Sequence, residues 1–294
     1  MIRKSLFLIF KRSFAILRTR NIRREKEEIR MRLYISADLE GITGISCWEE
    51  THKGNNEYEK ARLQMTKEVA AACRGALEAG VDFILVKDAH EEGKNLIHQL
   101  LPKEVKILSG WSNHPYNMVE GLDKSFDGAL FIGYHSGGHS NGSPLAHTLS
   151  IDAVRSISLN GQKADEFLLY THAAHWIGVP VIGVSGDGEL IRRVKAFDGQ
   201  IKTVAVQEGF GGAVVSIHPD LAISRIQKMA KKAVEAIGSF TTFSVEKYEL
   251  KVEFKNHQDA YKYSFYPGAE QVGEYTIRYS SSRYEDILTL LLFI

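Results

Sequence analysis

Two apolar strands joined by a long helix, all within residues 32–90, constrain the fold of this chain most. The segment RLYISA at 32–37 reads as a buried strand, and VDFILVKD at 81–88 is rich in Val, Ile and Leu. Between them, residues 57–79 carry apolar side chains at spacings of three and four, and Gly80 follows as a helix stop. A strand, a helix and a strand of this kind predict a right-handed βαβ unit in a parallel sheet.

The rest of the chain continues this alternation. Further strands are expected at 105–108, 128–135, 179–187 and 202–206, an extended hairpin at 147–161, and helices at 163–177, 188–197 and 219–237. Strands at about 247–255 and 270–279 and a last helix from Arg283 follow. The sequence therefore predicts an α/β fold with a mostly parallel sheet flanked by helices and a smaller C-terminal α+β portion.

The expected organisation has three parts. Residues 1–30 form a basic leader outside the fold, 31–208 a metal-binding α/β domain, and 209–294 a C-terminal α+β subdomain. The glycine-rich segment EGFGG at 208–212 is interpreted as the linker between the last two.

The leader holds ten Lys and Arg and three Asp and Glu, a charge of +7, whereas the whole chain carries +1 and residues 31–294 therefore carry −6. Its apolar run LFLIF is shorter than the apolar region of a secretory signal. A basic amphipathic helix on anionic lipid is one interpretation. We favour Met31 as the natural start, because the first well-formed strand begins at Arg32.

Composition excludes several classes of protein. With 44% apolar and 25% charged residues the chain can build a large core. The acidic body argues against a nucleic-acid partner, and no stretch approaches 18 consecutive apolar residues, so we expect no transmembrane helix. Two cysteines, Cys47 and Cys73, form neither a disulfide framework nor a zinc knuckle, and the expected location is the cytoplasm.

Polar side chains follow three of the expected strands at the point where each ends. Asp38 and Glu40 follow the first strand, His90 the second, and His135 the strand at 128–135. Because the carboxyl ends of parallel strands meet at one edge of a sheet, these side chains should lie together. Such ligands suit zinc, manganese or iron, and two bridging carboxylates would suit a two-metal hydrolase site. Glu166 is a fifth candidate, although the pattern alone does not prefer it to Asp165 or Asp187.

The remaining histidines have weaker signals. His147, in SPLAHTLS, could act as a general base, a nucleophile or an oxyanion partner, or it could simply pack at a strand start. His139 is interpreted as a loop residue and possible substrate contact. His172 and His175, three residues apart, lack the glutamate of a His-Glu-x-x-His site and are interpreted as partly buried helix residues.

Three further side chains are assigned to packing. Cys73 lies on the apolar face of the helix at 57–79 and is expected in the core. Trp48 and Trp111, near strand ends, are also expected to pack.

The sequence has no dinucleotide-binding glycine motif after the first strand, no P-loop and no Gly-x-Ser-x-Gly elbow, so nucleotide dependence and serine-hydrolase chemistry lose their usual support.

Six motifs together resemble the zinc-dependent D-aminopeptidase family, whose best-known members are encoded with dipeptide transporters. They are YISADLEGITG, VKDAH, MVEGLD, GALFIGYH, LAHTLS and the region of Glu166, in register over residues 31–294. The resemblance implies a dinuclear zinc peptidase that removes an N-terminal D-amino acid from short peptides such as D-Ala-D-Ala, and a ring-based decameric homo-oligomer.

Carried over by motif, the resemblance implies specific roles. The zinc ligands would be Asp38, Glu40, His90, His135 and Glu166, and His147 would be the catalytic nucleophile or base. The loop SGGHSNGSPL at 136–145 departs from the family pattern and could line the substrate site. Two alternatives stay open: a metallohydrolase acting on another amide or on a phosphoester, and a non-catalytic, zinc-stabilised peptide-binding oligomer.

Overall fold

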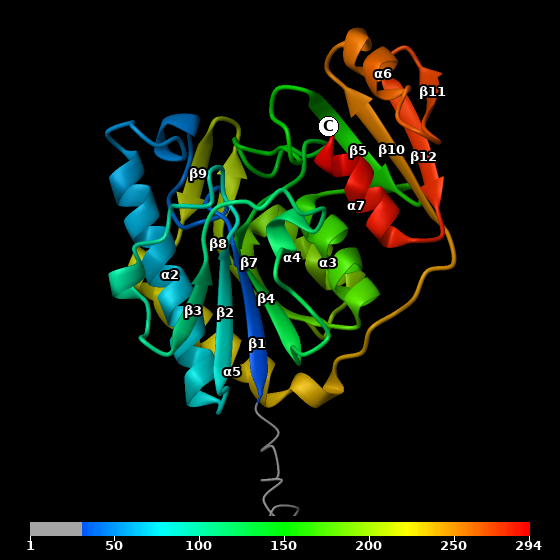
Figure 1. Cartoon of the computed structure of the whole chain (residues 1–294). Helices are drawn as coiled ribbons and strands as arrows, with labels where there is room; N and C mark the ends of the chain where they lie inside the picture. Colours follow the sequence, from blue (N-terminus) through cyan, green and yellow to red (C-terminus); the bar gives the residue numbers. More distant parts are fainter. Residues whose placement is uncertain (1–30) are drawn as a thin grey trace, which may run out of the picture. The chain divides into compact units, whose positions relative to one another are not determined.

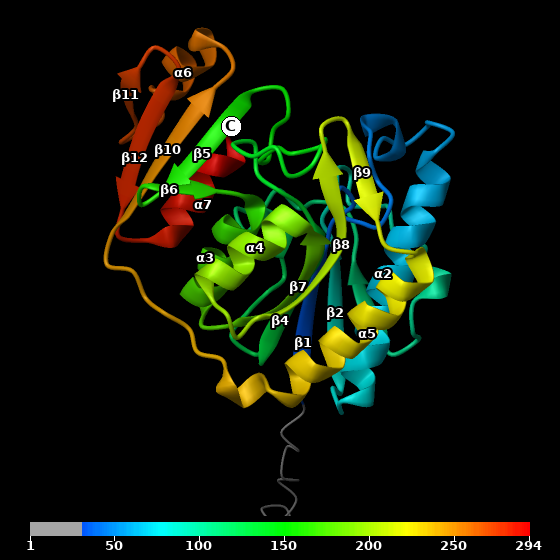
Figure 2. The same ribbon diagram turned by 180° about the vertical axis from the view of Figure 1, so that it is seen from behind.

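Two sheets organise the molecule in the computed structural model, which describes residues 31–294; the basic leader lies outside the described residues (Figures 1 and 2). The first sheet has seven strands in the order β3-β2-β1-β4-β7-β8-β9, all parallel except β9. They are β1 (Arg32–Ala37), β2 (Phe83–Asp88), β3 (Val105–Leu108), β4 (Gly128–Tyr134), β7 (Val181–Asp187), β8 (Lys202–Phe210) and β9 (Ala213–Ser216).

Both faces of the first sheet are covered by helices. On β1, Leu33 and Ile35 belong to one hydrophobic core and Tyr34 to the other, because side chains alternate between the faces of a strand. All three are fully buried. The near-continuous apolar sequence of β1 and β4 is the expected consequence of burial on two sides.

Four helices provide this cover. The amphipathic helices α2 (Tyr58–Glu78) and α5 (Pro219–Glu235) pack against each other over one face, so that α5 lies behind the strands in Figure 1 and in front of them in Figure 2. The other face carries α3 (Glu166–Ile177) and α4 (Gly188–Phe197). Cys73 is fully buried on α2, as expected for a small core residue.

The second sheet is antiparallel and has the order β11-β12-β10-β5-β6. Its elements are β5 (Val154–Leu159), β6 (Gln162–Ala164), β10 (Tyr248–Phe254), β11 (Glu270–Gly273) and β12 (Thr276–Ser281), with α6 (His257–Tyr263) and α7 (Tyr284–Leu292). Helix α7 joins this sheet to α3, where the Tyr284 hydroxyl donates to the carbonyl of Leu169 at 2.7 Å. The predicted fold class, a mostly parallel sheet with an added α+β portion, is therefore confirmed.

The interpretation of residues 208–212 as a linker was wrong. Glu208 and Gly209 are the end of β8 and pair with Val215 and Val214 of β9, and Gly211 turns the chain with a φ of 60°. The glycines belong to a hairpin turn, where a positive φ favours glycine. The boundary expected at position 208 does not separate the two sheets. Strand β9, which follows it, belongs to the first sheet, and β5 and β6, which precede it, belong to the second.

The chain order of the first sheet reverses beside β1. The chain runs outward from β1 through β2 to β3 and then returns to β4 on the other side of β1. Open α/β sheets bind their ligands outside the carboxyl ends of the strands at such a reversal. Asp38, His90 and His135 follow the ends of β1, β2 and β4.

Candidate metal centre

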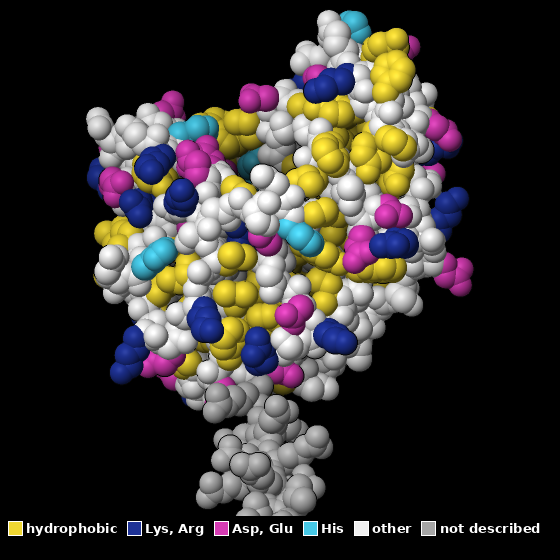
Figure 3. All heavy atoms as spheres, in the orientation of Figure 1, with side chains coloured by type: hydrophobic (Ala, Val, Ile, Leu, Met, Phe, Trp, Pro, Cys, Tyr) yellow, Lys and Arg dark blue, Asp and Glu magenta, His cyan; other side chains and the backbone are white. Residues whose placement is uncertain are grey.

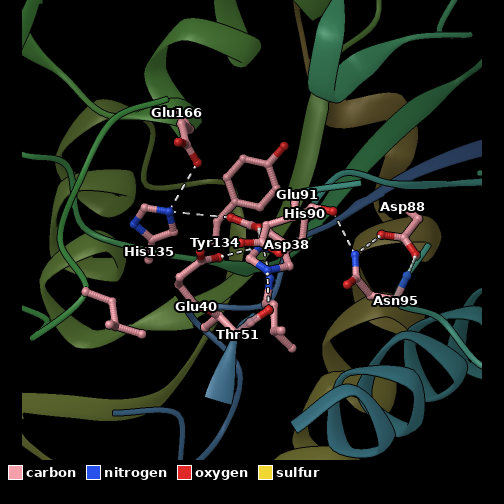
Figure 4. Close-up of polar contacts among 12 residues, drawn as sticks. Asp38, Glu40, Thr51, Asp88, His90, Glu91, Asn95, Tyr134, His135 and Glu166 are labelled. Atoms are coloured by element: carbon pink, nitrogen blue, oxygen red, sulfur yellow. Dashed lines mark hydrogen bonds and ion pairs between the residues drawn. The ribbon is translucent and has the colours of Figure 1, made fainter. Parts of the chain in front are cut away.

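Six predicted residues meet at the carboxyl edge of the first sheet, brought there by five segments of the chain. Figure 4 labels all of them except His147. They form two groups whose ligand atoms lie within 4.8 Å of one another in each group. The first group is Asp38, Glu40 and His90; the second is His135, His147 and Glu166. The structure therefore brings together all six residues that the family resemblance implies as ligands or catalytic residue.

A close approach between two backbones places the first carboxylates beside His135. The amide of Gly41 donates to the carbonyl of Gly133 at 2.9 Å, and a Cβ on Gly41 would lie 1.9 Å from the carbonyl oxygen of Tyr134. Gly133 has a φ of 75°, and a Cβ there would lie 2.3 Å from the carbonyl oxygen of Asp38. Only glycine fits at either position, so the ends of β1 and β4 can touch.

In the first group, His90 faces both carboxylates. Its Nδ1 lies 3.0 Å from Oε2 of Glu40 and 3.4 Å from Oδ1 of Asp38. Its Nε2 lies 3.0 Å from the carbonyl oxygen of Thr51, which can only accept a hydrogen bond. Nε2 therefore carries a proton, and Nδ1 is the nitrogen that faces the carboxylates and would bind a metal in place of its own proton.

The second group repeats this arrangement. Nε2 of His135 lies 3.2 Å from Oε2 of Glu166 and 3.5 Å from Oδ2 of Asp38, while Nδ1 donates to the carbonyl of Ser136 at 2.9 Å. The ring of His147 stacks on that of His135 with centroids 4.3 Å apart. Nδ1 of His147 donates to the carbonyl of Leu145, which leaves Nε2 as an acceptor 3.9 Å from Oε1 of Glu166.

The donor set fits a divalent metal. Oδ2 of Asp38, Oε2 of Glu40 and Nε2 of His135 are buried and have no hydrogen-bond partner among the described residues. Buried polar atoms are nearly always paired, so three orphaned ligand atoms in one cluster point to an ion. Carboxylate oxygens and imidazole nitrogens without a thiolate suit zinc, and Asp38 directs its two oxygens to histidines of different groups.

Charge in the centre is balanced by protons that a metal would replace. Burial and the neighbouring Glu40 raise the pKa of Asp38 to about 8. Burial opposes ionisation of Glu40, but His90 above all holds the pKa of that carboxyl well below its usual range. Burial likewise opposes protonation of His90, yet Glu40 and Asp38 hold its pKa well above normal. Two adjacent carboxylates cannot both be ionised here without a nearby cation.

Polar side chains behind the ligands fix their positions. The buried carboxylate of Asp88 accepts from the amides of Asn95 and Leu96, and the Asn95 side chain donates to the carbonyl of His90 at 2.7 Å (Figure 4). Tyr58 of α2 in turn donates to Asn95 at 2.6 Å. Asp88 thus supports the loop that carries His90 without contacting its ring.

The structure also separates Glu166 from the two aspartates that the sequence could not exclude. Asp165 caps α3 by accepting from the amide of Leu168 at 2.8 Å, and Asp187 caps α4 by accepting from Leu190 at 2.9 Å. Both are helix N-caps. The side chain of Glu166, the first residue of α3, instead points into the cluster and accepts from the amide of Leu149.

Comparison with known proteins now decides the family. The family model of Peptidase M55, D-aminopeptidase, matches residues 31–293. A D-aminopeptidase of Bacillus subtilis (strain 168) is 30% identical over 254 residues, which are 85% of this chain and 92% of that protein. The chain belongs to the D-aminopeptidase family. A solved structure, described as zinc-dependent D-aminopeptidase DppA from Bacillus subtilis, a self-compartmentalizing protease, matches with a TM-score of 0.84 at 28% identity over 90% of this chain and 96% of that one.

The D-aminopeptidase family resemblance in the sequence is therefore confirmed, and so is the assignment to a family of hydrolytic peptidases. The matched region excludes the basic leader and includes every residue of the candidate centre. The roles of the individual residues remain predictions that rest on the geometry described above.

A pocket of about 470 Å³ opens beside the centre of this D-aminopeptidase family member. Both tryptophans that the sequence assigned to packing line it, so that interpretation was incomplete. Trp48 packs edge-on against His147 with ring centroids 5.3 Å apart, and Lys87 lies 3.7 Å above the ring of Trp111. No sequence spacing signals this role, because Trp48 and Trp111 reach the same pocket only in the folded chain.

The loop at 136–145, which the sequence suggested for the substrate site, does not line this pocket. The wall next to His147 is formed instead by residues 149–151. His139 lies half-buried on that loop, next to Asp165, and also lies outside the pocket. The substrate contact suggested for His139 stays a prediction.

His172 and His175 lie on α3, away from the centre, as expected for partly buried helix residues. The ring of His172 packs against Phe243, Tyr248 and Tyr284. Burial lowers the pKa of each histidine to about 4. Neither belongs to a metal-binding group in the part of the chain that the structure describes.

Proposed function

We propose that this chain is a zinc-dependent aminopeptidase that removes an N-terminal D-amino acid from short peptides and holds two zinc ions per subunit. The observation that carries the proposal is the Asp38 carboxylate, whose two oxygens lie 3.4 and 3.5 Å from histidines of two separate ligand groups. A carboxylate placed this way suits a pair of metal ions sharing one bridging ligand. The D-aminopeptidase and zinc-dependent relatives support the choice of metal and reaction.

In the proposed site, Asp38, Glu40 and His90 would hold one ion and Asp38, His135 and Glu166 the other. Zinc bound there would supply Lewis acidity, lowering the pKa of water toward neutrality and polarising the scissile carbonyl. The backbone carbonyls of Thr51 and Ser136 orient the two histidine rings through their second nitrogens.

His147 is the proposed catalytic base or nucleophile. Burial first, and then the adjacent His135 ring, lower its pKa, so the imidazole is neutral at physiological pH. Its Nδ1 proton is engaged by Leu145, which leaves Nε2 free to accept a proton in the pocket. A neutral imidazole with one free nitrogen can take a proton during attack and return it to the leaving amine.

The lining of the pocket favours a peptide over a phosphoester. It includes four carboxylates and four histidines, and no Lys or Arg among the described residues. Phosphate recognition usually uses Arg or Lys donors. The pocket therefore offers a cationic amine better partners than it offers an anionic phosphate.

We also propose a homo-oligomer, a decamer by the family resemblance, and a cytoplasmic location. The solved relative is described as self-compartmentalizing. Large apolar side chains are exposed at the tip of the β8–β9 hairpin and around α6, β11 and α7, where Figure 3 shows hydrophobic side chains gathered: Phe210, Val215, Tyr261, Phe265, Val272 and Phe293. Light scattering coupled to size-exclusion chromatography measures the number of chains in the assembly.

No helix in residues 31–294 is long and apolar enough to cross a membrane.

The decisive experiment measures amino-acid release from D-Ala-D-Ala and, in parallel, from L-Ala-L-Ala. The protein is loaded with zinc, its zinc content is determined, and a chelated sample is the control. We expect two zinc ions per chain and chelator-sensitive release from the D-dipeptide alone. Release from neither peptide by the zinc-loaded protein would contradict the peptidase proposal for these substrates, and a content of one ion would contradict the dinuclear centre.

A further inference from the structure

The pocket beside the metal centre contains one carboxylate that the centre does not use. Of its four acidic lining residues, Asp38, Glu40 and Glu166 belong to the ligand groups, and the remaining one is Glu91. Glu91 follows His90 directly in the chain, next to the cluster in Figure 4, and its side chain is 28% exposed. It is thus a charged group that a bound substrate can reach.

The backbone of Glu91 is held in an uncommon conformation. Its φ is 41°, in the left-handed region that glutamate rarely adopts. The turn is closed by the amide of Gly93, which donates to the carbonyl of His90 at 2.8 Å, and Nε1 of Trp111 donates to the carbonyl of Glu91. Strained backbone that neighbouring groups maintain is concentrated at functional sites.

His52 orients the side chain and is itself held by Trp48. Oε1 of Glu91 lies 3.2 Å from Nε2 of His52, whose Nδ1 lies 2.6 Å from the carbonyl oxygen of Trp48. Trp48 packs edge-on against both His52 and His147. The Glu91 carboxylate therefore lines the same pocket as the proposed catalytic histidine, and His52 is its only ion-pair partner in residues 31–294.

We propose that Glu91 binds the free α-ammonium group of the substrate and so restricts the enzyme to unblocked N-termini. This inference rests on the proposed aminopeptidase function and adds the residue that would recognise the amine. An aminopeptidase must distinguish an ammonium group from an amide at the same position. A carboxylate oxygen that is accessible, oriented and not engaged by a metal ligand group provides the required charge-assisted hydrogen bond.

The test compares Glu91→Gln with Glu92→Gln. Glutamine preserves the size of the side chain and removes its charge, and the neighbouring Glu92 is exposed but does not line the pocket. The substrates are D-alanyl-p-nitroanilide and its N-acetylated form. For Glu91→Gln we expect a KM for the free amine about 10 to 100 times higher, kcat within about threefold and unchanged zinc content.

The same variant should lose preference for the free amine over the acetylated substrate by a similar factor, while Glu92→Gln should behave as the wild type. If Glu91→Gln keeps the KM and the preference of the wild type, the assignment is overturned although the peptidase function stands. If the wild type hydrolyses neither substrate, the proposed function fails, and binding decides the assignment separately.

Binding is followed through the fluorescence of Trp48 and Trp111, both in the pocket, during titration with D-alaninol and with 1-propanol, which lacks the amine. Weaker binding of D-alaninol to Glu91→Gln than to Glu92→Gln, with no difference for 1-propanol, supports the role of Glu91. Equal affinity of both variants for D-alaninol overturns it.

Discussion

Two groups of buried histidines in this molecule have opposite chemistry. His90, His135 and His172 are all at least nine-tenths buried, with exposed fractions of 4%, 1% and 9%. Carboxylates contact His90 and His135 and hold their pKa values well above normal, in spite of burial. His172 packs among aromatic rings, and burial lowers its pKa to about 4. Burial of an imidazole therefore does not identify a site; the groups that face it do.

The largest expected effect comes from replacing one histidine of each kind, His135 and His172, by phenylalanine. His135→Phe should lose zinc and lower kcat/KM by about a thousandfold or more, because it removes a ligand that faces two carboxylates. His172→Phe should keep both zinc and activity. Zinc analysis and D-peptide hydrolysis measure the difference, and equal zinc contents in the two variants would remove the basis of the comparison.

His147, which is only partly buried, tests whether a histidine of the centre can be removed without loss of the metal. His147→Ala should retain zinc while kcat falls about 100- to 10,000-fold, the range expected for loss of a general base. Metal analysis and kinetics on the same sample make the measurement. A parallel loss of zinc would show that His147 is a ligand of the second group, which its distance of 3.9 Å from Glu166 permits.

The pH dependence of unfolding tests the lowered pKa of His172, which packs among aromatic rings. An unfolded histidine takes up its proton near pH 6.5, whereas folded His172 does so only near pH 4. Because the unfolded state then binds more protons, the free energy of unfolding falls as pH drops from about 6.5 to 4, by up to about 3 kcal/mol for this residue. Urea unfolding of wild type and His172→Phe over this range should show a smaller fall in the variant. Parallel curves would contradict the depressed pKa.

The smallest expected effect concerns a carboxylate behind the centre. Asp88→Asn should weaken zinc binding about tenfold, because Asp88 fixes Asn95 and the loop of His90 without touching the ring. Competition with a chromophoric chelator measures this affinity. An effect as large as that of His135→Phe would place Asp88 among the ligands.

Much of the fold and site followed from local sequence signals. The strand at 32–37 and the helix at 57–79 were predicted with ends close to those observed, since their periodicity and the stop at Gly80 are local. Asp38, Glu40, His90 and His135 were expected to lie close together because strand ends converge in parallel sheets, and the structure places them so. Glu166 needed the family resemblance, because only the folded chain shows that Asp165 and Asp187 are helix caps.

Other features depend on contacts between distant segments and have no local signature. The hairpin at 208–216 resembled a linker because its glycines hide the alternation of β8 and β9. Trp48 lies in the pocket through its packing on His147, about a hundred residues away, and Thr51 contributes only a backbone carbonyl, which is the same in every residue type. Such contributions are invisible to reasoning from side-chain type.

The pairing of β5 with both β6 and β10 sets an order of events for a growing chain. Every residue of the centre has been synthesised by position 166, but β10, which lies beside β5, begins only at Tyr248. Helix α3, whose first residue is Glu166, likewise accepts a hydrogen bond at its Leu169 carbonyl from Tyr284, far later in the chain. The helix that begins at Glu166 is thus held by a residue 115 positions beyond Leu169, so a truncation before Tyr284 would remove support from the candidate centre although every residue of the centre remains.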